Sequence, residues 1–214
     1  MKVISFVSQK GGSGKTTLAV SCAVAAQSAG QKVVIFDMDP QASAEAWYQT
    51  REEETPNLVR VTSQQLEEAV TRAEGAGFEL IFIDTAGRDE PTTAAAIRAS
   101  DLCIIPCRPT PADMKATPAT IATINRLEKA AAAFVLSQTP ARGYRIREAE
   151  HGLRVLGLVA PAKTVLRNAY QDAFGSGMGV TEFEPEGKAA AEIREIWTWI
   201  EKKLSKVGQN AKAA

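Results

Sequence analysis

The sequence contains few of the residues that build several common kinds of site. Its 214 residues include three cysteines and one histidine, and aromatic residues make up 6% of the chain. An odd number of cysteines without disulfide spacing argues against a secreted scaffold held by disulfides. A single histidine leaves a zinc centre of histidine and cysteine short of ligands. We therefore interpret Cys103 and Cys107, which flank the apolar run Ile104–Pro106, as core residues rather than metal ligands.

The chain also lacks net charge and long hydrophobic runs. Its 25 basic residues balance 25 acidic ones, so binding to nucleic acid or anionic lipid would need a local patch. No uncharged apolar stretch approaches the roughly 20 residues of a membrane-spanning helix, and Met1 and Lys2 lead directly into a strand-like run rather than a signal peptide. We expect a cytoplasmic protein. With 45% hydrophobic residues, the chain suits one globular domain at residues 1–206, followed by a disordered tail at 207–214.

Apolar runs typical of β-strands alternate with helical patterns almost to the end of the chain. This alternation predicts an α/β fold with a mainly parallel twisted sheet that carries helices on both faces. One predicted helix has Leu66 and Ala73 on its apolar stripe, with Ser63 as its N-cap. The predicted strands span residues 2–7, 32–37, 58–61, 79–84, 102–106, 133–137 and 155–160.

The most informative segment is the glycine-rich run Ser8–Thr17, with the sequence SQKGGSGKTT, between the first predicted strand and a helical pattern. Its glycines permit a backbone whose N–H groups surround an anion, and the next helix points its positive end at the same place. Lys15 would neutralise the outer phosphates, and the Thr16 hydroxyl would bind a bridging magnesium ion. The run predicts a phosphate-binding loop, the alternative being a glycine-rich turn that binds nothing. The predicted phosphate contacts are Lys10, Gly11, Gly12, Ser13, Gly14, Lys15, Thr16 and Thr17.

Aspartates follow two further predicted strands. Asp37 and Asp39 come at and after the end of the strand at 32–37, and Asp84 ends the strand at 79–84. Because ligands of an open parallel sheet bind beyond the carboxyl ends of its strands, we expect these aspartates beside the phosphate loop. Asp84 has the pattern of a Walker B aspartate, which holds magnesium directly or through water beside Thr16. The alternative for Asp39 and Asp84 is a turn or helix-capping role.

Together, the segments at 10–17, 37–41 and 82–87 closely resemble the ParA/MinD family of deviant Walker A ATPases, and the similarity runs nearly from end to end. The chain is most similar to the short, ParF-like ParA proteins of plasmid partition. Gln9 replaces the first glycine of the ordinary Walker A pattern, and Lys10 is the additional lysine of the deviant form. The resemblance implies that Lys10 reaches the phosphates of the partner's ATP in a dimer, that Asp39 positions the attacking water, and that Asp37 helps to hold magnesium through water.

The resemblance therefore implies a catalytic set and a metal set. The catalytic set is Lys10, Lys15 and Asp39; the metal set is Thr16, Asp37 and Asp84. In relatives, the loop after the last predicted strand lines the adenine pocket, so Pro161 is the expected adenine contact. The segment Pro106–Asp113 resembles a proline-rich loop near the dimer interface; an equally good alternative is a rigid connection from strand to helix.

By the same resemblance, we expect an ATPase that uses ATP and Mg2+, forms an ATP-dependent homodimer, binds non-specific DNA and segregates or positions plasmid or chromosomal DNA. It would be associated with the nucleoid, and its partner would be a small DNA-bound centromere-binding protein of the ParB or ParG kind. The basic residues available for a DNA-binding patch are Arg142, Arg145, Arg147, Arg154, Lys163, Arg167, Lys202, Lys203 and Lys206.

Two alternatives keep the fold but change the role. A MinD-like membrane-cycling ATPase would use a C-terminal amphipathic helix on the bilayer surface. Here Ile193, Trp197 and Ile200 do fall on one helical face, but the other face carries acidic residues, and core packing explains the stripe better. We therefore expect no stable membrane association. An electron-donating or cofactor-synthesis enzyme of the same superfamily would need cysteines placed to share an iron–sulfur cluster, for which the apolar setting of Cys103 and Cys107 is poor.

Overall fold

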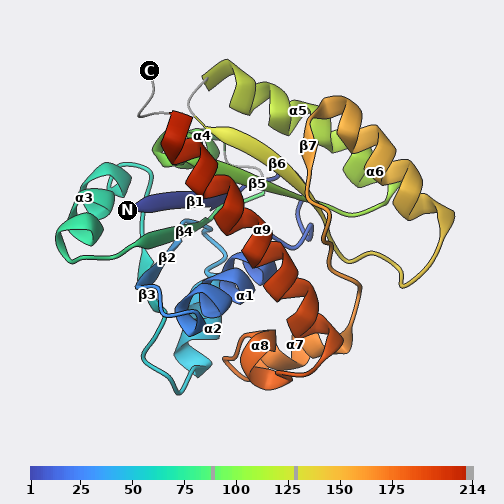
Figure 1. Ribbon diagram of the computed structural model, residues 1–214. Helices are drawn as coiled ribbons and strands as arrows, with labels where there is room; N and C mark the ends of the chain where they lie inside the picture. The colour runs from blue at the N-terminus through green and yellow to red at the C-terminus, as the bar shows by residue number, and fades with distance from the viewer. Residues whose placement is uncertain (88–89, 128–129, 211–214) are drawn as a thin grey trace.

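The computed structural model describes residues 1–87, 90–127 and 130–210. Its centre is a seven-stranded sheet with the order β3-β2-β4-β1-β5-β6-β7, in which every strand pair is parallel (Figure 1). The strands are β1 (Lys2–Phe6), β2 (Val33–Asp37), β3 (Asn57–Arg60), β4 (Leu80–Asp84), β5 (Leu102–Cys107), β6 (Ala131–Leu136) and β7 (Leu158–Val159). The predicted α/β fold with a parallel sheet is confirmed.

Helices cover both faces of this sheet. Figure 1 shows α1, α2, α7, α8 and α9 on one side and α3 to α6 on the other. Because β2, β4 and β5 are buried along their whole length, they need apolar side chains on both faces, as their sequences predict. The helices are α1 (Lys15–Ser28), α2 (Ser43–Thr50), α3 (Leu66–Gly75), α4 (Glu90–Ala99), α5 (Pro111–Leu127), α6 (Tyr144–Leu156), α7 (Asn168–Gly175), α8 (Val180–Phe183) and α9 (Lys188–Asn210).

Two local predictions differ from the structure. The sequence predicts the last strand at 155–160, but Val155 belongs to α6, and the strand is reduced to Leu158–Val159. The cap of α3 is also different: Gln65 is its N-cap, and the Ser63 hydroxyl bonds to the Gln64 side chain instead of a helix amide. At the start of α3 the selected contacts are local, since the Thr62 N–H and hydroxyl both donate to the Gln65 side chain.

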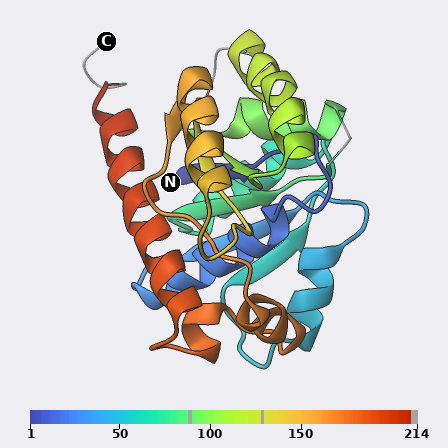
Figure 2. The same ribbon diagram turned by 90° about the vertical axis from the view of Figure 1, so that its right-hand side faces the viewer.

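The C-terminal helix α9 packs its apolar stripe into the core. Figure 2 shows α9 running along one side of the molecule. Ile193, Ile196 and Ile200 are fully buried, and the Trp197 ring lies 5.6 Å from that of Phe82 on β4. The apolar stripe of α9 therefore packs against the sheet. No helix in the described part of the chain is long and apolar enough to cross a membrane.

The predicted tail at 207–214 lies partly within this helix. α9 continues through Asn210, and residues 211–214 lie outside the described residues. Cys103 and Cys107 are buried and free, in agreement with their interpretation as core residues, and Cys22 is buried and free as well.

The parallel sheet brings the ends of β1, β2 and β4 to one edge. Phe6 of β1 and Asp37 of β2 are both register partners of Asp84 on β4. The glycine-rich loop that follows β1 therefore begins beside Asp84, which ends the neighbouring strand β4, and Asp37 ends β2, the next strand beyond it. This edge holds the candidate site.

Candidate functional site

The glycine-rich loop connects β1 to α1, and two of its residues have backbone conformations that favour glycine. Gly12 has a φ of 71° and Gly14 a φ of 98°, and Gly14 serves as the N-cap of α1. An L-residue is strained in this left-handed region, so these glycines permit the tight turn. The loop places Lys15 at the start of the helix with 7% of its surface exposed. Backbone amides, the positive helix end and a buried ammonium group thus meet at one point, which is the arrangement of an anion-binding site.

The residues directly after β6 hold this loop in place. The Ser137 hydroxyl donates to the Ser13 carbonyl at 2.7 Å, and the Gln138 side-chain amide donates to the Gly12 carbonyl at 3.0 Å. Gln138 itself has a φ of 49°, an uncommon conformation for a residue with a side chain. Neither residue is among those predicted from the sequence. The sequence does contain a feature that could have indicated them: both are polar residues that directly follow a strand, and such residues lie at the edge of the sheet where ligands bind.

Asp84 is a fully buried carboxylate at the base of the loop. Neither of its oxygens has a hydrogen-bond partner among the described residues. Burial raises the pKa of Asp84 from 3.8 to about 7, and the negative charges of Asp37 and Asp39 add to the shift. The Thr16 hydroxyl and the Lys15 ammonium oppose it, although the Thr16 geometry falls short of a hydrogen bond. A desolvated carboxylate without a partner is a costly arrangement that a bound cation would relieve.

The residues present fit a magnesium ion. Asp84 and Thr16 offer hard oxygen ligands side by side, as Mg2+ prefers. No three carboxylate, histidine or cysteine side chains converge into a metal cage in residues 1–87, 90–127 and 130–210. This also agrees with magnesium, which proteins usually hold through one or two carboxylates and the substrate's phosphates.

Asp37 and Asp39 both have structural partners. The two carboxylate oxygens of Asp37 accept the Asp39 and Glu45 amide protons, each at 3.0 Å, which fixes the start of α2. Burial raises the pKa of Asp37, and the two amide hydrogen bonds oppose that shift. Asp39 is half-buried and accepts the Gln41 amide at 2.9 Å. The turn contact considered from the sequence for Asp39 is therefore present, on the wall of the site, and Asp37 makes a capping contact of its own behind that wall.

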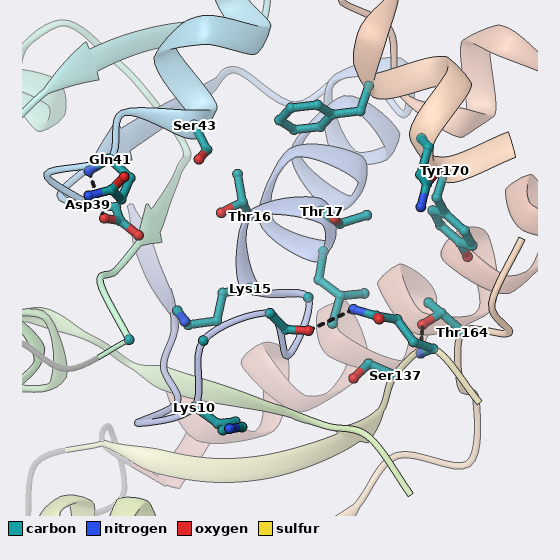
Figure 3. Close-up of a pocket in the computed structure, with 18 of the residues that line it drawn as sticks. Lys10, Lys15, Thr16, Thr17, Asp39, Gln41, Ser43, Ser137, Thr164 and Tyr170 are labelled. Carbon is teal, nitrogen blue, oxygen red and sulfur yellow. Dashed lines mark hydrogen bonds between the residues drawn. The ribbon is translucent and has the colours of Figure 1, made fainter. Parts of the chain in front are cut away.

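The two loop lysines differ in their environments (Figure 3). Lys15 is buried, and burial lowers its pKa, while the charges of Asp84 and Asp39 raise it. Lys10 is half-buried, and its backbone N–H bonds to the Ser8 hydroxyl. Gly87 packs closely on the loop, since a Cβ atom there would lie 3.2 Å from the Gly11 nitrogen and 3.5 Å from the Lys15 ammonium. Lys15 thus lies inside the site and Lys10 nearer to its opening.

A pocket of about 1020 Å3 opens beside this loop. One end is polar, with the loop and Asp39, and the other is formed by the segment Thr164–Arg167 and by α7. Asp37, Asp84 and Ser13 lie behind the lining, and Pro161, the expected adenine contact, lies outside it. Residues 164–167, which follow Pro161 in the same loop, do line the pocket. Its lining includes Lys10, Gly11, Gly12, Gly14, Lys15, Thr16, Thr17, Asp39, Ser43, Gln138, Leu166, Tyr170, Phe174 and Gly175.

Comparison with known proteins agrees with this geometry. Residues 4–172 match the model of the CobQ/CobB/MinD/ParA nucleotide binding domain. The chain is 30% identical to the maintenance of carboxysome distribution protein A of Gloeobacter kilaueensis, over 100% of this chain and 88% of that protein.

Two solved structures share the fold. The cell division ATPase MinD of Pyrococcus furiosus has a TM-score of 0.74 at 20% identity, covering 94% of this chain and 98% of that one. The septum site-determining protein MinD of Pyrococcus horikoshii, complexed with Mg-ADP, has a TM-score of 0.75 at 18% identity, covering 96% and 98%.

Proposed function

The chain belongs to the CobQ/CobB/MinD/ParA nucleotide-binding family, and from this premise we propose that it is a magnesium-dependent ATPase that positions a DNA-linked cargo. In this proposal it dimerises when it binds ATP, holds DNA without sequence preference while dimeric, and releases DNA after hydrolysis. The observation that carries the enzymatic part is the unpartnered Asp84 carboxylate beside Thr16, below a glycine loop that suits phosphates.

Each residue of the site has a role in hydrolysis under this proposal. The loop amides and Lys15 bind the phosphates and supply positive charge where it is needed as the phosphoryl group transfers. Asp39, on the pocket wall, orients the attacking water. Asp84 and Thr16 would hold magnesium, with Asp37 behind them, and the ion when bound neutralises phosphate charge. The adenine base would occupy the end of the pocket near Phe174 rather than contact Pro161.

Lys10 and the exposed glycines of the loop support a dimer. Gly11 and Gly12 are exposed and Lys10 is half-buried at the pocket lining, so a second subunit can approach the phosphates over this surface. A cation supplied across the interface makes association depend on the charge of the triphosphate. Lys10 would then act in the partner's site.

The start of α6 offers the best surface for DNA. Arg142, Arg145 and Arg147 are exposed, and no ion pair within the described ranges involves them. By contrast, Arg154 pairs with Glu150 and Arg167 with Glu192, both at 2.6 Å. Free arginines at three nearby positions, doubled in a dimer, supply the phosphate contacts that a neutral chain needs. Such binding would place the protein on the nucleoid.

The cargo and the partner follow from resemblance. The ParA-like motifs support segregation of plasmid or chromosomal DNA, with a small centromere-binding protein of the ParB or ParG kind as the stimulating partner. A second candidate cargo is a protein assembly, favoured by the similarity over the whole chain to a carboxysome distribution protein. Hydrolysis assays with the product of the neighbouring gene, with and without its DNA site, separate the two: stimulation that requires the DNA site supports DNA cargo.

Calorimetry with ATP and Mg2+ tests the enzymatic proposal. We expect the wild-type chain to bind, and Lys15→Ala to bind roughly tenfold more weakly or worse, since the variant has no ammonium group to pair with the phosphates. Lys115→Ala, at an exposed position on α5, is the matched control. Lys10→Ala should keep monomer binding and lose ATP-dependent dimers in sedimentation. A wild-type chain that takes up no adenine nucleotide would refute the proposal.

Retention on DNA tests the proposed surface. Arg145→Ala and Arg147→Ala should each weaken ATP-dependent retention on DNA of any sequence and lower the salt slope by about 1 for each DNA phosphate that is no longer neutralised. Arg154→Ala removes an arginine already paired with Glu150 and serves as the control. If Arg145→Ala and Arg147→Ala are both retained on DNA as well as the wild-type chain and the Arg154→Ala control, this surface does not bind DNA.

A further inference from the structure

The two walls of the nucleoside end of the pocket are joined at a second point, away from the phosphates. One wall is the start of α2, which contributes Ser43, and the other is α7, which contributes Tyr170, Phe174 and Gly175. In Figure 3, Ser43 and Tyr170 lie on opposite sides of α1, and in Figure 2 α2 and α7 are neighbours at the bottom of the molecule. A ligand between these walls is held more closely when the walls stay together than when they separate.

Arg51, at the C-terminal end of α2, joins the two walls. Its guanidinium makes a two-pronged ion pair with Glu182 of α8, at 2.8 and 2.7 Å. It also donates to the Gly177 carbonyl at 2.9 Å and twice to the Thr55 carbonyl, at 2.8 and 2.6 Å. All five donors of the fork thus have acceptors, and the side chain is only 2% exposed. We call this set of contacts the Arg51 latch.

Neighbouring residues strengthen the latch. The guanidinium lies 5.1 Å from the Trp47 ring centre, and the Trp47 indole N–H donates to the Met178 carbonyl at 3.1 Å. Gly177 has a φ of 67°, and a Cβ atom there would lie 2.5 Å from the Arg51 nitrogen. The segment after α7 therefore approaches the end of α2 too closely to leave room for a side chain at Gly177. Separating the two segments would expose a buried, paired charge and break its hydrogen bonds together.

Such an arrangement acts in an all-or-none way. A buried guanidinium that loses its carboxylate keeps the desolvation penalty without the compensating attraction, so partial opening is unfavourable. The walls therefore either remain together or separate in one step. The latch lies at the far end of α2 from Ser43, with no atom at the phosphates, so it can change the rate of opening without changing the chemistry of hydrolysis.

We propose that the Arg51 latch controls nucleotide release by holding α2 against the α7–α8 segment, which makes Arg51 and Glu182 positioning residues for the nucleoside end of the pocket. The inference rests on the proposed function, because it assumes that adenine nucleotide occupies this pocket. It places control of nucleotide release in the ion pair between Arg51 and Glu182, which lies apart from the proposed catalytic residues.

Glu182→Gln is the most direct test. The substitution removes the charge of the latch, while the amide oxygen can still accept the Gly179 N–H that caps α8, a hydrogen bond of 2.9 Å in the wild-type chain. Stopped-flow displacement of a fluorescent ATP analogue in the presence of Mg2+ measures release. We expect release to become about tenfold faster, within the range typical of energetic coupling between sites. Hydrolysis of prebound ATP in a single turnover should keep its wild-type rate. Arg51→Lys, which lacks the planar fork, should give the same result.

Two controls separate the latch from general effects. Glu45 lies on α2, whose C-terminal end carries Arg51 of the latch, but its carboxylate pairs with Arg60 of β3 and not with the latch. Glu45→Gln removes this carboxylate. Leu153→Ala opens a cavity in the core on the opposite face of the sheet and lowers stability without contacting α2 or α7. Neither should change release.

The outcomes are distinguishable. If the wild-type chain binds the analogue and both latch variants release it at the wild-type rate, the inference is wrong while the proposed function stands. If Leu153→Ala accelerates release as much as Glu182→Gln does, the effect is general destabilisation and the latch has no specific role. If the wild-type chain binds no analogue, the inference and the proposed function both fail.

Discussion

Replacing Asp84 by asparagine should stabilise the nucleotide-free protein above neutral pH, although it removes a proposed magnesium ligand. The wild-type carboxylate is fully buried, with no hydrogen-bond partner for either oxygen among the residues described. Its pKa rises from 3.8 to about 7. At roughly 1.4 kcal/mol for each pKa unit, ionised Asp84 lowers the free energy of unfolding by about 4 kcal/mol. The uncharged asparagine amide avoids this penalty.

The sign of the effect fixes its pH dependence. Native Asp84 keeps its proton to higher pH than the same residue in the unfolded chain, so the wild-type free energy of unfolding falls as the pH rises from about 4 to about 7. Below pH 4 both states are protonated, and the variant gains nothing. Above pH 7 the gain reaches its full value of up to about 4 kcal/mol, a large part of the stability of a typical domain.

Urea unfolding of the apo proteins at several pH values between 4 and 8 measures this difference. Asp172→Asn makes the same chemical change at an exposed position of α7 and is the matched control. Wild-type protein with saturating Mg2+ and ATP should recover the lost stability, and the Asp84→Asn variant should recover much less. An Asp84→Asn gain that is absent, or equal at pH 4 and pH 8, would refute the assignment of a strained, desolvated carboxylate to this position.

Three further predictions concern particular residues. Gly177→Ala should destabilise the protein more than Gly30→Ala in thermal unfolding, because both positions have positive φ, costing about 1–2 kcal/mol, but only the former meets backbone within 2.6 Å. Ser137→Ala should weaken ATP binding in calorimetry by about 1 kcal/mol, because a buried carbonyl of the phosphate loop loses its donor; unchanged affinity would contradict this. Burial raises the pKa of Cys22 and Cys103 to about 12, so both should resist a thiol reagent until urea unfolds the chain.

The sequence predicts the parts of the site that depend on local chemistry. The glycine loop is recognisable because its conformation needs residues without a Cβ, and Asp84 is recognisable because an aspartate ends an otherwise apolar strand. The parallel sheet follows from apolar runs that alternate with helices. These features depend on residues close together in the chain, so a single sequence is enough to find them.

The parts that escaped prediction depend on pairing between distant segments. Gln138 is 126 residues from the Gly12 carbonyl that it contacts, and Arg51 is 131 residues from Glu182. Nothing near either residue in the sequence indicates such a partner. The end of α6 shows a related difficulty, since Val155 is β-branched and suits a strand, but the helix continues through it to Leu156.

The central place of β1 in the sheet has a consequence for how the protein fluctuates. Ile4 is fully buried, and β1 is paired on both sides, with Phe82 of β4 and Leu102 of β5 as the partners of Ile4. Amide hydrogens of such a strand exchange with solvent only when the whole domain opens, whereas the two-residue β7 at the rim can fray alone. The strand that precedes the phosphate loop, β1, is therefore expected among the slowest-exchanging parts of the molecule. The edge strand β7 can open locally while the loop keeps its conformation.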